Sequence, residues 1–99
     1  MANKIGTTFA HGTKTSIGAT AVQLSATRSF TSQNGIKLKA DTANTAPVYI
    51  GNSSAVTSSG STKGYPLLAG QETTVPIAYP DLIYLISTGG SQTVDFIQA

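Results

Sequence analysis

Few residues of this 99-residue chain carry groups that could do chemistry. His11 is the single imidazole, there is no Cys, and no Ser lies in a Gly-x-Ser-x-Gly turn. Nucleophilic catalysis needs a base held rigidly beside the nucleophile, whereas His11 sits next to Gly12 in a stretch without a regular hydrophobic period. We therefore predict that His11 is not catalytic and that it is exposed or contacts another protein.

The four acidic residues, Asp41, Glu72, Asp81 and Asp95, are the remaining candidates. A glycosidase pair needs two carboxyl groups held about 5–10 Å apart in a cleft. Asp41 and Asp81 instead lie in polar turns, where Asp bonds the local backbone, and Asp95 alternates with apolar residues as an outward-facing strand residue does. Because calcium-loop and phosphate-loop motifs are also absent from the sequence, we predict no enzyme activity, no metal site and no cofactor.

The composition favours a protein that works by contact. Ser and Thr make up 26 of the 99 residues, Gly another 10, and charged residues only 10%. Charged residues are depleted in the same way at the cores of protein interfaces. The net charge of +2 comes from six scattered basic residues, whereas nucleic-acid-binding proteins cluster theirs on one face. No run approaches the ~20 apolar residues of a membrane span, so we expect neither nucleic acid nor a membrane as partner.

Alternation of apolar and polar residues with a period of two predicts short strands. The expected strands are 21–26, 27–33, 36–40, 48–50, 65–68, 73–78, 82–86 and 93–97. Asn34-Gly35 predicts a type I′ hairpin turn between the second and third of them. Pro76 makes 73–78 an edge strand, the continuous apolar run 82–86 reads as the most central strand, and residues 52–64 are expected to form a surface loop. The predicted fold class is all-β: a small antiparallel β-sandwich or jelly-roll-like barrel.

We expect two parts, an extended N-terminal arm over residues 1–19 and a β-sandwich domain over residues 20–99. The arm is interpreted as ordering on a neighbouring subunit, with a frayed terminus as the alternative. Tyr49 and Tyr84 are expected to pack in the core, which leaves Tyr65 and Tyr79 as the more exposed tyrosines. The candidate interface residues are Ile5, Phe9, His11, Ile17, Tyr65 and Tyr79.

Three stretches, residues 36–52, 64–72 and 82–94, carry a recognisable pattern. In the first, a strand ending in a polar Asn turn leads into Val48-Tyr49-Ile50-Gly51; the second is a Gly–Leu–Gly-type turn; the third begins with an Ile-Tyr strand. Together they resemble small structural proteins of tailed-bacteriophage virions over roughly residues 20–98. Residues 1–19 lie outside this resemblance.

The resemblance implies a virion structural protein, above all a decoration (cement) protein that binds the outer capsid shell and bridges capsomers. It implies the major capsid protein as partner, self-association as a homotrimer, and a location on the capsid surface after synthesis in the host cytoplasm. Residues 1–12 lack the apolar core of a signal peptide, which fits that location. The alternatives are a head–tail joining or tail or fibre accessory protein, and a carbohydrate-binding module that would use Tyr65, Tyr79 and the 52–64 loop.

Overall fold

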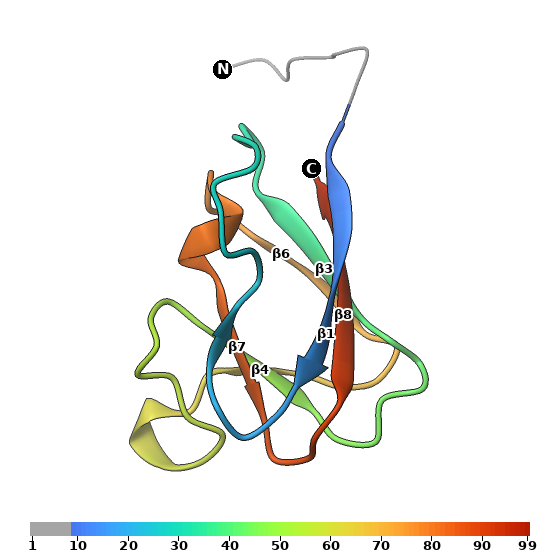
Figure 1. Ribbon diagram of the computed structural model, residues 1–99, viewed down its shortest axis with the longest axis vertical. Helices are drawn as coiled ribbons and strands as arrows, with labels where there is room; N and C mark the ends of the chain where they lie inside the picture. The colour runs from blue at the N-terminus through green and yellow to red at the C-terminus, as the bar shows by residue number, and fades with distance from the viewer. Residues whose placement is uncertain (1–8) are drawn as a thin grey trace.

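The computed structural model describes residues 9–99 as two four-stranded sheets packed face to face (Figure 1). Two short 3₁₀ turns, η1 (Gly60–Thr62) and η2 (Pro80–Leu82), lie between strands. The strands are β1 (His11–Ile17), β2 (Val22–Gln23), β3 (Ile36–Ala40), β4 (Val48–Gly51), β5 (Tyr65–Leu67), β6 (Glu72–Val75), β7 (Tyr84–Ser87) and β8 (Gln92–Gln98).

The strand order is that of a jelly roll. Sheet A has the order β1-β8-β3-β6 and sheet B the order β2-β7-β4-β5, and all neighbours are antiparallel. The pairs β4·β5, β3·β6, β2·β7 and β1·β8 form one long ribbon that folds back at the 52–64 loop. Rolling this ribbon brings β3 against β8 and β4 against β7. The predicted antiparallel sandwich is confirmed, and within residues 9–99 the two sheets do not close into a barrel.

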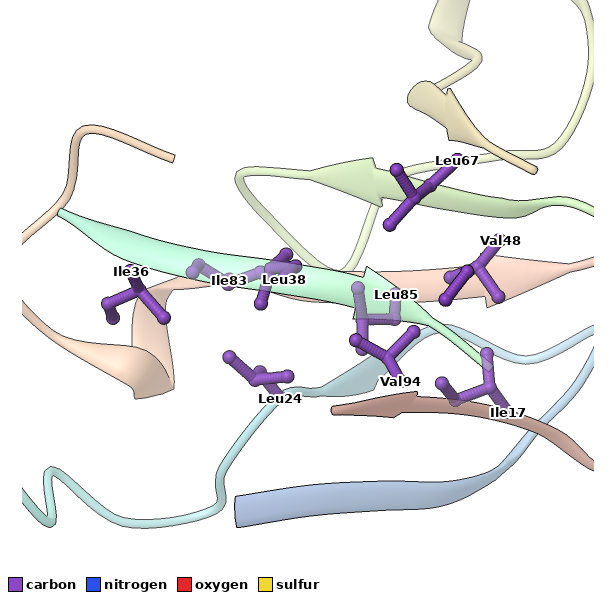
Figure 2. Packing of buried hydrophobic residues seen from close by; sticks show 10 residues of the cluster. Ile17, Leu24, Ile36, Leu38, Val48, Leu67, Ile83, Leu85 and Val94 are labelled. Atoms are coloured by element: carbon purple, nitrogen blue, oxygen red, sulfur yellow. The ribbon is translucent and has the colours of Figure 1, made fainter. Parts of the chain in front are cut away.

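The core lies between the two sheets and is built by strict alternation. In β3, Ile36, Leu38 and Ala40 are fully buried while Lys37 and Lys39 point to solvent, as the sequence predicts. Figure 2 shows Leu85 of β7 and Val94 of β8 meeting across the layers. Each large aliphatic side chain buried in this way contributes about 1.5–3 kcal/mol to folding, so this layer is the main source of stability.

Strand β7 is an inner strand of sheet B, as expected for the central apolar run, and Leu85 is fully buried. The expectation that residues 82–86 are covered on both faces is wrong at two positions. Leu82 belongs to η2 and is 39% exposed, and Tyr84 is only half-buried on the outer face. The reason is Pro80, which is compatible with the first turn of a helix and starts η2, so that the strand begins only at Tyr84.

The predicted division at residue 19 is wrong for the described part of the N-terminal segment. Residues 11–17 form β1, which pairs with β8, and Ile17 is fully buried in the core. Gly12, which interrupts the hydrophobic pattern of the sequence, is needed for packing, because a Cβ there would lie 2.6 Å from Cζ of Phe96. A bulge between Lys14 and Ile17, with Ser16 at φ 58°, turns Ile17 inward. The sandwich therefore includes β1, and Ile5 lies outside the described residues.

The predicted hairpin at Asn34-Gly35 does not form. Gly35 has the positive φ of 94° but Asn34 does not, and β3 pairs with β6 and β8 instead of residues 27–33. Those residues run as an irregular segment whose backbone is held by a 2.7 Å bond from the Ser32 amide to the Ala78 carbonyl. Phe30 in this segment stacks on Phe96, with ring centroids 6.3 Å apart. The segment therefore caps one end of the core.

Truncation of Leu38 tests how much the core contributes to the free energy of unfolding. We expect Leu38→Ala to lower the free energy of unfolding by about 2–5 kcal/mol, because it leaves a cavity in the core between the two sheets. The matched control is Lys39→Ala, on the solvent face of the same strand, which should change it by no more than about 0.5 kcal/mol. Urea unfolding followed by circular dichroism measures both, and equal effects would contradict the assigned faces of β3.

Deletion of residues 1–17 should prevent stable folding, because it removes a whole edge strand and the fully buried Ile17. Deletion of residues 1–8 keeps every described contact of β1 and should leave a cooperative thermal transition. Differential scanning calorimetry on the two truncated proteins makes the comparison. A stable fold after loss of residues 1–17 would show that β1 is dispensable to the sandwich.

Candidate functional site

The outer surface of sheet A gathers side chains from four strands. The register places His11, Ile97 and Lys37 in one row and Thr13, Asp95, Lys39 and Glu72 in the next. Phe9, just before β1, completes a shallow hollow of about 510 Å³ over this surface. We call it the sheet A face, defined by Phe9, His11, Thr13, Lys37, Lys39, Glu72, Asp95 and Ile97.

The sheet A face has an apolar part beside the β1 edge. Phe9 is 65% exposed and Ile97 is 38% exposed. The rings of Phe9 and His11 lie at a tilt with centroids 6.1 Å apart. Phe9 and His11 were predicted from the sequence, whereas Ile97 was missed. Its outward orientation could have been read from the alternation that begins at Asp95, two residues earlier on the same strand.

The charged part of the sheet A face is balanced. Lys37 reaches diagonally to Glu72, with 2.5 Å between Nζ and Oε1, and the hydrogen bond from Lys37 lowers the pKa of Glu72. Thr13 donates a 2.7 Å hydrogen bond to Asp95. Within residues 9–99, Lys39 and Asp95 belong to no ion pair. One cation and one anion therefore stay available on this face for a partner.

A second surface, the intersheet groove, lies where the two sheets diverge beside β5 and β6. Its volume is about 380 Å³, and no charged side chain lines it. Tyr65 on its rim is 63% exposed. The apolar lining consists of Ile50, Tyr65, Val75, Pro76, Ile77, Leu82 and Ile83. The sequence pointed to Tyr65 alone, because the other residues belong to separate strands and turns that only the fold brings together.

Tyr79 has a different role from the one expected. The Arg28 guanidinium carbon lies 3.9 Å from the centroid of the Tyr79 ring, and Arg28 makes a two-pronged contact with Asp81 at 3.1 and 3.3 Å. This cluster, in which the Arg28 side chain is 51% exposed, ties the irregular segment before β3 to η2. Tyr79 packs against the Arg28 guanidinium and Ile17 lies in the core, so neither lines the sheet A face or the intersheet groove.

Across residues 9–99, no three His, Asp or Glu side chains lie close enough together to hold a metal ion. The same part of the chain contains no helix long and apolar enough to cross a membrane. Every buried side-chain nitrogen or oxygen in the described part has a hydrogen-bond partner. The two surfaces of the described residues are thus the amphipathic sheet A face and the intersheet groove with its largely apolar lining.

Comparison of the chain with protein-family models, with curated proteins and with solved structures gives no significant match.

The Arg28–Asp81 contact predicts that the stability of the fold depends on pH, with a direction set by the pKa of the Asp81 carboxyl group. The hydrogen bond from Arg28 lowers the pKa of Asp81 below its ordinary value of 3.8 in the folded protein. The contact therefore stabilises the fold above that value, and the stabilisation is lost as the pH falls through the lowered pKa. Arg28→Ala should raise the pKa of Asp81 towards 3.8 and should destabilise the protein at pH 7 more than at pH 2.

Carboxyl chemical shifts followed by NMR through an acid titration measure this pKa. The control is Lys37→Ala, which should raise the pKa of Glu72 and leave Asp81 unchanged, because Lys37 contacts the other carboxyl group. An Asp81 pKa that is the same with and without Arg28 would refute the assigned contact.

Proposed function

We propose that the protein is a structural component of a tailed-phage virion, specifically a decoration protein that binds the outer capsid shell and bridges capsomers. The observation that carries the proposal is the sheet A face, where exposed Phe9 and Ile97 adjoin a balanced set of charges. A rigid, shallow and amphipathic surface of this kind suits docking on another protein. It is too open to enclose a small molecule as ligand pockets do.

Two further observations support this proposal. The jelly-roll order of the strands is one that viral capsid domains use, although lectins and other classes use it too. The resemblance over residues 20–98 to small virion proteins points the same way and covers β2 to β8. Weak contacts become effective on a shell because a bridging protein engages several capsomers at once. The major capsid protein is the proposed partner.

Titration of purified capsids of the source phage with the protein tests the proposal. We expect saturable binding on the order of hundreds of copies per particle, as a repeating lattice site requires. Saturation at about a dozen copies or fewer would overturn decoration in favour of a head–tail or tail position, where few symmetry-related sites exist. Absence of capsid binding together with clear hits on a glycan array would favour the carbohydrate-binding alternative.

Ile97→Asp tests the surface itself. We expect it to weaken capsid binding by about tenfold or more, because a charge replaces an apolar side chain at the middle of the sheet A face. Leu68→Asp is the matched control, since Leu68 is 49% exposed but lies outside this face, and it should bind like the wild type. Thermal unfolding checks that both variants are folded, and equal binding by both would place the contact elsewhere.

A further inference from the structure

Two exposed apolar features of residues 9–99, Phe9 and the intersheet groove, lie at opposite edges of sheet A. Phe9 immediately precedes β1, which is one edge strand. The intersheet groove lies along β6, which is the other edge strand, and residues 73–75 of β6 line it. β8 and β3 lie between these edges. At about 4.8 Å between neighbouring strands, the two edges are roughly 14 Å apart across the sheet. Phe9 continues the line of β1 along one edge, so it does not reach the groove at the other edge of its own molecule.

The groove has the properties of a site for an extended apolar segment. Its lining carries no charge, and its volume of about 380 Å³ can accept an aromatic side chain. Strand β6 (Glu72–Val75) is an edge strand whose outer side pairs with no strand within residues 9–99, so another strand can add to it. The neighbouring edge, β5, is blocked by Pro66, which has no N–H to donate. An incoming strand would therefore pair with β6 and direct alternate side chains into the groove.

The segment around Phe9 has the matching pattern. In an extended chain, side chains alternate between two faces, so Ile5, Thr7 and Phe9 would share one face and Lys4, Gly6 and Thr8 the other. The eight residues before Phe9 contain no acidic residue and a single Lys. At about 3.3 Å per residue they can span roughly 26 Å, twice the length that the four residues of β6 require.

We propose that Phe9 and the residues before it dock in the intersheet groove of a second copy of this chain, adding a strand to the free edge of β6. The contact is heterologous, because a projecting segment on one copy meets a groove on the next. Such contacts repeat head to tail and form a closed ring when the rotation allows it; the homotrimer implied by the sequence resemblance is one such ring. This contact does not depend on the capsid role, because it joins copies of the isolated protein. It takes up Phe9 and leaves Ile97 and the charged side chains of the sheet A face for the capsid.

Two variants isolate the two halves of the contact. Phe9→Asp removes the projecting apolar side chain, and Leu82→Asp places a charge in the uncharged groove. Light scattering after gel filtration should show wild-type protein as an oligomer at high concentration and each variant alone as a monomer. We expect either substitution to raise the apparent dissociation constant by about tenfold or more. Leu68→Asp, outside both features, is the control and should remain oligomeric.

Mixing the two variants gives the decisive result. Phe9→Asp keeps an intact groove and Leu82→Asp keeps an intact Phe9 segment, so one complete contact can form between them. We expect the mixture to give a one-to-one dimer that grows no further. A monomeric wild type, an oligomeric Phe9→Asp protein, or a mixture without dimers would each overturn the proposal. If Leu82→Asp does not fold, Tyr65→Asp on the exposed rim of the groove replaces it.

Discussion

The pairing of β8 with both β1 and β3 is the interaction on which the rest of the structure depends. It joins the two ends of the described chain: Phe96 of β8 lies between Gly12 of β1 on one side and Leu38 of β3 on the other. This register places Val94 in the core and Asp95 on the sheet A face. A shift of one residue would exchange these two sets of side chains, so the core and the candidate interface are specified together.

Buried polar contacts support this register where the strands meet the loops. Gln92, at the start of β8, is almost completely buried, and its amide oxygen accepts a 2.8 Å hydrogen bond from the backbone of Thr45. Its amide nitrogen donates to the Gly90 carbonyl at 2.8 Å. Asn44 likewise exchanges two hydrogen bonds with the backbone of Thr93. With few charges available, the protein orders its connections through amide groups, which need exact partners when they are buried.

The parts that the sequence predicted well are those determined locally. The alternation of apolar and charged residues in β3 predicts which side chains of that strand are buried. Pro76, directly after β6, correctly predicts that β6 is an edge strand. The errors come from contacts between residues far apart in the chain. The strand character of residues 11–17 depends on β8, some 80 residues away, and Asn34-Gly35 makes no hairpin because β3 finds its partners in β6 and β8. Of the residues that line the two candidate surfaces, the sequence analysis named Tyr65, Phe9 and His11 as interface candidates, because exposed aromatic rings and a lone imidazole stand out by residue type.

The four edges of the two sheets are not equally protected, and the difference bears on assembly. β2 has only two residues, β5 carries Pro66, and β1 is interrupted by the bulge at Ser16, each of which limits pairing with another chain. Along β6, Pro76 comes only after Val75, and among residues 9–99 no strand pairs with the outer edge of β6. In the proposed assembly, this open edge beside an apolar groove would be the single directional contact between copies. Because β6 and β1 are opposite edges of sheet A, that contact would lie on the other side of the sheet from Phe9, and this separation would set the geometry of the chain or ring.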